Sequence, residues 1–320
     1  MGSTSGARVI ALVLNYVHWE DSSACIQSLL DSSYKNLEIF VIDNCSPNDS
    51  EAQLRSRFSG LTFYQTGKNL GYTGGINFGI NKAFESESEY IFVINPDTTV
   101  EPECLELLVG ALNRDQDAAI AGGTIVRADD PNKVWYAGGE IVPWKGVAEH
   151  YTTLAKNSYE DVQGYKRVSF VTGCAMLLRT DSLKTIGLLD ERFFMYLDDV
   201  EFCVRAENAG FQLIYVPAAR ITHNVVWVDK AIHKMYYSVR NRYLLIHTSF
   251  VGYDRWFALI YFTLSILVKM INWRFGNDQY FKASKMGIED YLAHNFGPGR
   301  GLDFVTAPLK ENRGKAIPRG

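Results

Sequence analysis

Short apolar runs alternate with stretches of helical periodicity along the first two thirds of the chain. Turn residues bound the apolar runs, which is typical of strands. Strands alternating with helices form a mostly parallel sheet with right-handed crossovers, so we expect an α/β fold with a sheet flanked by helices. The pattern predicts strands at 9–14, 37–42, 61–64, 90–94 and 119–126, and helices that include about 75–86 and 102–113.

The middle of the chain is less regular. Positions 128–166 are rich in Gly, Asp, Pro and aromatic residues, which indicates a surface insertion beside the site, with a hairpin around 136–139. An amphipathic helix is expected from the Asp198-Asp199 pair to Gly210. Further strands are expected at 168–172, 175–178, 212–216 and 221–223.

Polar residues stand where several of the predicted strands end: Asn15, Asp43, Asn69 and Asp97. Ligands of open α/β sheets bind at this edge. Asp43 could accept hydrogen bonds from a nucleobase or ribose, and Asp97 could reach a divalent cation. A lone Asp at a strand end is usually a turn residue, so each position taken alone keeps that simpler interpretation.

Positions 69–79 form a Gly-rich loop that enters a predicted helix. Backbone N–H groups at such a helix start could meet a phosphate. The loop has neither the Lys-Ser/Thr of a P-loop nor the G-x-G-x-x-G spacing. Its glycines could equally serve close packing of the helix.

Two adjacent carboxylates, Asp198 and Asp199, follow an apolar and aromatic stretch at 193–197. Removing an ionised carboxylate from water is costly unless a cation or hydrogen-bond donors compensate, so such a pair is usually ion-paired, metal-bound or catalytic. The alternative is a helix start at which the two acids only complement the helix dipole.

The net charge of −4 hides an asymmetry, because from Arg220 onward 15 Lys and Arg residues face 7 acidic residues, against 17 and 29 before it. From Val228 the chain is helical, aromatic and basic, so we divide it into a large α/β domain at 1–227 and a helical extension at 228–320. A basic extension suggests an anionic partner, either a membrane surface or a phosphorylated substrate, with a solvated basic face as the alternative. No nucleic-acid partner is expected.

An apolar run of 13 residues at 256–268 ends at Lys269, whereas a membrane crossing needs about 20 residues. We expect it to lie in the interface of an anionic membrane, with a buried helix or a contact between copies of the chain as alternatives. The five cysteines show no metal-binding spacing and indicate reduced core residues of a cytosolic protein. The predicted location is therefore cytoplasmic, peripheral at the inner face of the cell membrane if the run binds lipid.

Taken together and in order, these motifs resemble the inverting, nucleotide-sugar-dependent glycosyltransferases of family 2, whose fold is called GT-A. The resemblance is to the branch that contains bacterial rhamnosyltransferases and galactofuranosyltransferases, and it covers about residues 8–300. It is carried by Asn15-Tyr16, Asp43-Asn44, the loop at 69–79, Asn95-Pro96-Asp97, Val171-Thr172-Gly173, the segment 194–199, His223 and Tyr236-Tyr237-x-x-Arg240-Asn241.

The resemblance implies roles for the acids. Asp199 would be the general base for the acceptor hydroxyl, and Asp198 would help to orient the acceptor. Asp97 matches the second acid of the Asp-x-Asp metal motif and His223 matches a further ligand, for Mg²⁺ or Mn²⁺ at the diphosphate. Asn95 replaces the first acid of that motif, which should weaken metal affinity and puts the dependence on metal in question.

The remaining implied contacts are to donor and acceptor. Arg240 shares a helix face with Tyr236 or Tyr237, and its planar fork suits phosphate oxygens, so we expect it at the donor diphosphate or an anionic acceptor; a surface arginine is the alternative. Acceptor contacts are implied for Thr172, Gly173 and Tyr236. Donor contacts are implied for Asn15, Asp43, Asn69, Gly71, Asn77, Asn95, Asp97 and Arg240.

The implied function is transfer of a hexose or deoxyhexose from a nucleotide diphosphate donor to a glycan or lipid-linked acceptor in bacterial surface-polysaccharide synthesis. On the branch resemblance, dTDP-rhamnose is the first donor, and a UDP-hexose or UDP-galactofuranose is the second. A non-catalytic sugar- or nucleotide-binding scaffold is the alternative from another class, against which the retained acids argue. A homo-oligomer is a further expectation for the extension.

Overall fold

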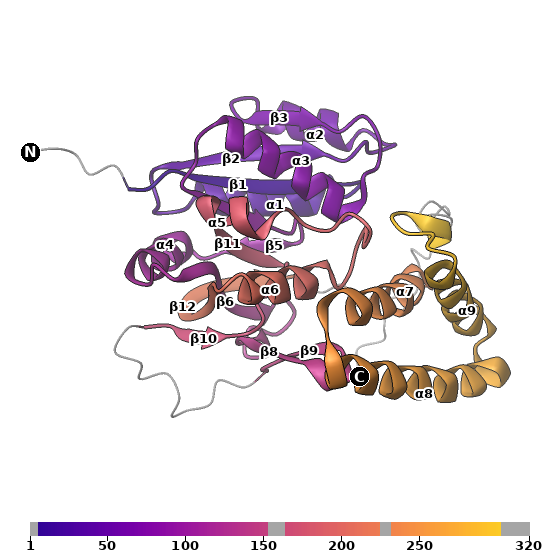
Figure 1. Ribbon diagram of the computed structural model, residues 1–320. Helices are drawn as coiled ribbons and strands as arrows, with labels where there is room; N and C mark the ends of the chain where they lie inside the picture. Colours follow the sequence, from indigo (N-terminus) through magenta and orange to yellow (C-terminus); the bar gives the residue numbers. More distant parts are fainter. Residues whose placement is uncertain (1–5, 153–163, 225–231, 302–320) are drawn as a thin grey trace, which may run out of the picture.

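The computed structural model describes residues 6–152, 164–224 and 232–301 (Figure 1). Within them a ten-stranded sheet has the strand order β10-β12-β6-β11-β4-β1-β2-β3, with β5 and β7 paired to β12 and β6. Its strands are β1 (Val9–Asn15), β2 (Leu37–Asp43), β3 (Thr62–Gln65), β4 (Tyr90–Ile94), β5 (Thr98–Val100), β6 (Ala118–Arg127), β7 (Val134–Tyr136), β10 (Lys166–Val168), β11 (Ala175–Arg179) and β12 (Gln212–His223).

Helices flank this sheet, which confirms the predicted α/β class. A helical region follows at the C-terminal side, where α8 runs along the lower edge of the view in Figure 1. The helices are α1 (Trp19–Leu30), α2 (Ser50–Arg57), α3 (Gly71–Glu85), α4 (Cys104–Arg114), α5 (Thr180–Ile186), α6 (Asp198–Asn208), α7 (Ile232–Ser249), α8 (Gly252–Gly276) and α9 (Asp278–Leu292).

The sheet is parallel in its first half and mixed in its second. β3, β2, β1 and β4 run parallel, as expected for strands joined by helices. β11 lies antiparallel between β4 and β6, whereas β6 and β12 are parallel. The polar residues at the ends of the parallel strands therefore share one edge, and Asn15 lies opposite Asp43 in the register.

Several predicted elements differ in extent. The strand expected at 168–172 ends at Val168, and the following residues leave the sheet to form part of the site. The strands expected at 212–216 and 221–223 are one strand, β12, with a bulge between Val216 and Arg220. The hairpin lies later than predicted, between β8 (Gly139–Val142) and β9 (Val147–His150), around the short helix η1 (Pro143–Lys145). Part of this insertion lies outside the described residues.

Close packing of α3 explains the glycines of the loop at 69–79. A Cβ on Gly75 would lie 2.6 Å from the Leu14 side chain, and one on Gly79 would lie 2.3 Å from that of Ile42. These glycines let α3 lie directly on β1 and β2. The packing alternative is thus the correct explanation for these two positions.

The helical extension is not separate from the sheet. Val239, Tyr243 and Leu244 of α7 are buried in the same apolar core as the strands. The proposed boundary at 227/228 lies outside the described residues, and the division into two domains stays a prediction. Four of the five cysteines are buried, but Cys45 is exposed, so the prediction of core thiols fails there.

Candidate active site

The acid pair opens α6 directly after a strained turn. Phe194, Tyr196 and Leu197 all have left-handed backbones, with φ of 64°, 67° and 66°. Such conformations cost a non-glycine residue of the order of 1–3 kcal/mol and persist only where the surroundings enforce them. The turn leaves Asp198 and Asp199 in the first helical turn, where the helix dipole favours negative charge.

Two adjacent residues of α7 hold this turn. The Asn241 amide donates to the carbonyl oxygens of Phe193, Met195 and Tyr196 at 2.9, 2.7 and 2.9 Å. Arg240 Nη2 donates to the carbonyl oxygens of Arg192 and Phe193, and its Nη1 donates to that of Gly297. We call these two residues of α7 the α7 clamp.

Two residues of α7 that were predicted to contact substrate have protein partners instead. Arg240 is fully buried and spends its donors on backbone carbonyl groups and on Asn241, so the structure does not support a phosphate contact. Tyr236 is also fully buried and its hydroxyl donates to Asp290, so it is not placed to touch an acceptor. Helical spacing predicted the shared face correctly, but that face points into the protein.

Asp199 accepts two backbone hydrogen bonds. Its Oδ2 accepts from Gly173 N at 2.9 Å and its Oδ1 from Val200 N at 2.9 Å. A Cβ on Gly173 would lie 3.1 Å from the Cβ of Asp199, so the glycine permits this approach. Burial raises the pKa of Asp199, while the Gly173 N–H and nearby His150 act to lower it. The carboxylate is thus oriented, and each oxygen keeps a lone pair for a substrate proton.

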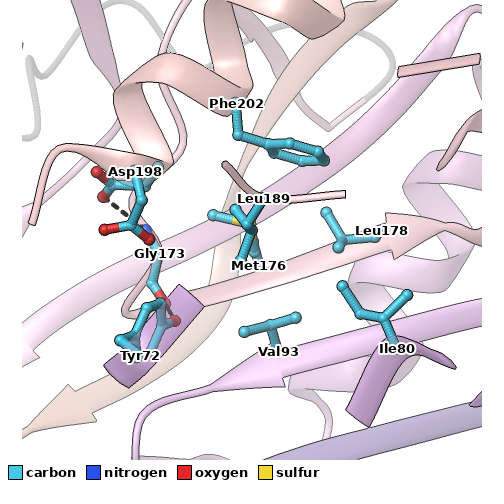
Figure 2. Close-up of a pocket in the computed structure, with 10 residues that line it drawn as sticks. Tyr72, Ile80, Val93, Gly173, Met176, Leu178, Leu189, Asp198 and Phe202 are labelled. Carbon is cyan, nitrogen blue, oxygen red and sulfur yellow. Dashed lines mark hydrogen bonds between the residues drawn. The ribbon is translucent and has the colours of Figure 1, made fainter. Parts of the chain in front are cut away.

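Asp198 and Asp199 both line a largely apolar cavity of about 10 Å³ (Figure 2). Figure 2 shows Asp198 with Gly173 and Tyr72 at one side of the lining, and Val93, Leu178 and Ile80 at the other. Burial, and next the charge of Asp199, raise the pKa of Asp198 well above its ordinary value. Of the two acids Asp199 is the better candidate for the base, because the N–H groups of Gly173 and Val200 help to keep its carboxylate ionised and able to take a proton.

The Asp97–His223 pair forms a second polar cluster. His223 Nε2 lies 3.3 Å from Asp97 Oδ2. The pKa of His223 is raised: burial acts to lower it, but the contacts with Cys174 and Asp97 outweigh that effect. Among the residues that the structure describes, Asn95 Oδ1 and His223 Nδ1 are buried atoms without a hydrogen-bond partner. These unpartnered polar atoms, one carboxylate and one imidazole fit a Mg²⁺ or Mn²⁺ ion that takes its other ligands from diphosphate and water.

The described residues do not build a complete metal cage by themselves. Within residues 6–152, 164–224 and 232–301, no group of three or more His, Cys, Asp or Glu side chains could hold an ion. Two protein ligands plus substrate phosphates are the usual arrangement for Mg²⁺. Any ion here would therefore depend on the nucleotide for much of its coordination.

The dipeptide Gly173-Cys174 joins the two clusters. Gly173 N donates to Asp199, and the Cys174 carbonyl oxygen accepts from Asn95 N at 2.8 Å. Thr172, which precedes them, is buried and its Oγ1 accepts from Cys174 N at 3.4 Å, so its predicted acceptor contact stays a prediction. The acid pair and the Asp97–His223 pair thus flank one short segment.

The Asn15–Asp43 pair lies at the carboxyl ends of β1 and β2, and β1 is the neighbour of β4 in the sheet. Asp43 accepts hydrogen bonds from Asn15 Nδ2, Ser46 N, Ser46 Oγ and Gln65 Nε2 at 2.6–2.9 Å and is 1% exposed. These four donors use the usual acceptor capacity of a carboxylate. Direct contact of Asp43 with a nucleotide would require one donor to leave, so in this structure Asp43 orders the loop around Ser46.

The start of α3 offers no open phosphate site. Tyr72 N and Thr73 N donate to the Phe194 carbonyl oxygen, and Gly71 N donates to Asn69 Oδ1. Asn77 is buried and exchanges hydrogen bonds with the backbone of Leu189. In place of the predicted donor contacts, Asn69 and Gly71 bond to each other and Asn77 joins α3 to the segment before the acids.

Sequence reasoning missed an aromatic wall beside the acids. The Trp135 ring lies 4.9 Å from the rings of both His150 and His223, edge to face in each case. His150 stacks on Phe170 at 5.4 Å. The insertion was expected beside the site, but neither Trp135 nor His150 lies in a periodic pattern or a motif that could have identified it.

Comparison with known proteins agrees with this arrangement. The family model described as glycosyl transferase family 2 matches residues 9–187. The rhamnosyltransferase WbbL of Escherichia coli is 36% identical over 232 residues, covering 67% of this chain and 83% of that protein. The N-acetylglucosaminyl-diphospho-decaprenol L-rhamnosyltransferase of Mycobacterium tuberculosis is 25% identical over 218 residues, covering 62% and 70%.

Two further likenesses extend the picture. The dTDP-rhamnosyl transferase RfbF of Shigella flexneri is 23% identical over 250 residues, covering 73% of this chain and 79% of that protein. Among solved structures, GalNAc-T7 with UDP, GalNAc and Mn²⁺ superposes with a TM-score of 0.56 at 14% identity, covering 74% of this chain and 51% of that one. The structural likeness supports the predicted GT-A-like fold and nothing finer.

Proposed function

Because the chain belongs to glycosyl transferase family 2, we propose that it transfers a hexose or deoxyhexose with inversion and that Asp199 is its general base. The predicted class of enzyme, a glycosyltransferase, is confirmed, and the non-catalytic scaffold is set aside. One observation carries the assignment of the base. Asp199 is oriented by Gly173 N, and the next residue, Cys174, contacts the Asp97–His223 cluster.

The mechanism uses these two clusters on opposite sides of the sugar. Asp199 would take the proton of the acceptor hydroxyl as it attacks the anomeric carbon. Asp198, the neighbouring acid, would help to orient the acceptor. Asp97 and His223 would hold Mg²⁺ or Mn²⁺, which when bound neutralises charge on the leaving diphosphate.

Replacement of the base tests this assignment. Asp199→Asn should bind the nucleotide donor normally but transfer sugar at least about 100-fold more slowly. Released nucleoside diphosphate and product mass measure the transfer, and calorimetry measures donor binding. Turnover close to that of the wild type would reject Asp199 as the base, and lost donor binding would assign it a binding role instead.

The metal proposal has a readout besides activity. Asp97→Ala and His223→Ala should each abolish the gain in nucleoside diphosphate affinity that Mg²⁺ or Mn²⁺ gives the wild type. Their effects should be non-additive, since the two side chains would share one ion. If thorough chelation leaves the affinity of the wild type for nucleoside diphosphate unchanged, a metal site at Asp97 and His223 is rejected.

For the donor we propose dTDP-rhamnose first and a UDP-hexose or UDP-galactofuranose second. The names of the three relatives, all rhamnosyltransferases, support this order. A lipid-linked acceptor is supported by the relative from Mycobacterium tuberculosis, whose name specifies a diphospho-decaprenol. A panel of dTDP- and UDP-sugars, read by released diphosphate, tests the donor directly.

We further propose that α8 binds the surface of an anionic membrane. Of the described helices, α8 is long and apolar enough to cross a membrane by length and composition. One face packs on the protein through Ala258, Phe262, Ile266 and Met270. The opposite face is an exposed apolar stripe, which comprises Tyr253, Trp256, Phe257, Ile260, Tyr261, Leu264, Leu267, Val268, Ile271 and Phe275.

This stripe suits a bilayer surface better than a crossing or a second copy. A crossing would have to detach the packed face from α7, α9 and η1. The exposed cations Lys269 and Arg274 border the stripe near its end, and each could gain roughly 1 kcal/mol at an anionic surface. Free thiols at all five cysteines agree with a location at the cytoplasmic face.

Flotation with liposomes tests the membrane proposal. Wild type should float with anionic vesicles more than with neutral ones, and Leu264→Glu should not float. Leu292→Glu is the matched control, because Leu292 is 69% exposed on α9 and lies outside the stripe. Failure of the wild type to bind either vesicle, together with a concentration-dependent dimer that Leu264→Glu disrupts, would assign the stripe to contact between copies.

A further inference from the structure

The aromatic wall formed by Trp135 and His150 lies between the two reactive clusters. Trp135, on β7, contacts the rings of both His223 and His150, each at 4.9 Å between ring centroids. His150, at the end of β9, lies within electrostatic reach of Asp199, because each group influences the pKa of the other. Residues from the insertion thus connect the residues proposed for the diphosphate with the proposed base.

The neighbouring contacts fix the wall in place. His150 stacks on Phe170 and meets Tyr136 edge to face at 5.4 Å. A hydrogen bond joins His150 to the backbone of Trp135. Trp135 and His150 nevertheless remain partly exposed, whereas Tyr136 and Phe170 behind them are buried. The wall therefore has a supported back and an accessible front.

In an inverting displacement the sugar ring lies between the leaving diphosphate and the attacking hydroxyl. The diphosphate belongs at Asp97 and His223, and the hydroxyl belongs at Asp199, so the ring has to pass along the front of the wall. We infer that Trp135 and His150 form the subsite for the transferred sugar. The indole packs against the apolar C–H groups of a hexose ring, and the imidazole hydrogen-bonds one of its hydroxyl groups.

This subsite rests on the proposed function and adds its sugar specificity. An indole offers an apolar surface and no acceptor, so it favours a ring face without hydroxyl groups, such as that around the methyl group of a 6-deoxyhexose. The imidazole of His150 can hydrogen-bond a hydroxyl, because burial lowers its pKa and favours the neutral form, which both donates and accepts. The two side chains would together discriminate between hexoses that differ in their hydroxyl positions.

A comparison of sugar nucleotide with bare nucleotide tests the subsite. Trp135→Leu should weaken binding of dTDP-rhamnose at least about tenfold, the usual size of one lost apolar contact, and leave dTDP affinity unchanged. His150→Phe, which keeps the ring on Phe170 but removes its nitrogens, should also weaken dTDP-rhamnose alone. Trp144→Leu is the matched control, because Trp144 is 47% exposed in the same insertion and contacts Tyr261 rather than the site.

The outcomes separate this inference from the function on which it rests. UDP and UDP-glucose serve as a second pair if the wild type prefers uridine donors. Equal loss of sugar nucleotide and bare nucleotide in Trp135→Leu would show that the indole only supports His223 and would overturn the subsite. Unchanged binding of both would overturn it too, while wild type that binds none of the four ligands would reject the proposed function itself.

Discussion

The α7 clamp gives the most direct test of how the fold prepares the base. Asn241→Ala removes an amide whose two N–H groups serve three backbone carbonyl oxygens of the strained turn. Each net hydrogen bond is worth about 1 kcal/mol, so the unfolding free energy should fall by about 2 kcal/mol. Arg240 would still hold the carbonyl oxygens of Arg192 and Phe193, but those of Met195 and Tyr196 would lose the amide, so the left-handed backbone that follows them should relax.

The larger effect should be on the rate. A shift of about 1 Å in a catalytic group commonly costs on the order of 100-fold in rate, so we expect kcat to fall by about that factor. The KM for the nucleotide donor should change little, because the clamp touches neither Asp97 nor His223. Steady-state kinetics at saturating donor and chemical denaturation measure the two effects separately.

Arg242→Ala is the matched control for this prediction. Arg242 is the next residue of α7 and donates to the carbonyl oxygens of Gly146 and Lys145 at 3.1 and 2.8 Å, away from the acid turn. Its loss should destabilise the protein comparably but leave kcat within about threefold of the wild type. Equal losses of kcat in the two variants would refute the argument that the clamp positions Asp199.

Further predictions concern the turn and the acids. Gly71→Ala should cost at least about 2 kcal/mol, because a Cβ there would lie 2.3 Å from the Phe194 ring at φ +73°; Gly67→Ala, at φ +77° with no neighbour within 4 Å, should cost less on denaturant unfolding. Asp198→Asn should stabilise the protein, because the raised pKa of Asp198 makes the unfolding free energy of the wild type fall as pH rises through that pKa. Denaturation at several pH values should show that the stabilisation by Asp198→Asn grows with pH. A stabilisation that does not change with pH would contradict this. The rate of transfer should fall as pH decreases through the raised pKa of Asp199, and a profile that is unchanged in Asp199→Glu would point to another base.

The parallel part of the fold could be predicted because its signals are local. Each buried strand is one apolar run, and the polar residue after it stands where the run ends. Neighbouring strands then bring Asn15 and Asp43 together without further information. The antiparallel insertion of β11 could not be predicted in this way, since its partners β4 and β6 are chosen by long-range pairing that leaves no trace in periodicity.

The sequence indicated where the acids of the candidate site lie, but it could not show which polar side chains are buried and bonded within the protein. Asp198 and Asp199 proved to be both helix-start acids and buried acids, so the two interpretations of the sequence were compatible. Arg240 showed the opposite case, because a planar cation suits backbone carbonyls as well as phosphate, and only the packing of α7 shows which it meets. Trp135 and His150 carry no signal at all, because each is placed by a tertiary contact.

Two elements connect the proposed membrane face of α8 with the site around Asp198 and Asp199. Helix α8 packs on η1, where Trp144 meets Tyr261, and η1 lies in the hairpin that ends at His150. Helix α7, which carries Asn241, also packs on α8. The hairpin that carries His150 and helix α7, which both lie beside the proposed base, thus pack on α8, the helix proposed to contact the bilayer.

This arrangement predicts which substrates need the membrane. Docking through α8 would fix the side from which a lipid-linked acceptor reaches Asp199, whereas a water-soluble acceptor analogue would reach it without docking. Leu264→Glu should therefore lose most transfer to a polyprenyl-linked acceptor in anionic vesicles and keep transfer to the soluble analogue. Leu292→Glu should keep both. Equal loss of both activities in Leu264→Glu would mean that α8 supports the site through packing alone, because only membrane docking distinguishes the two acceptors.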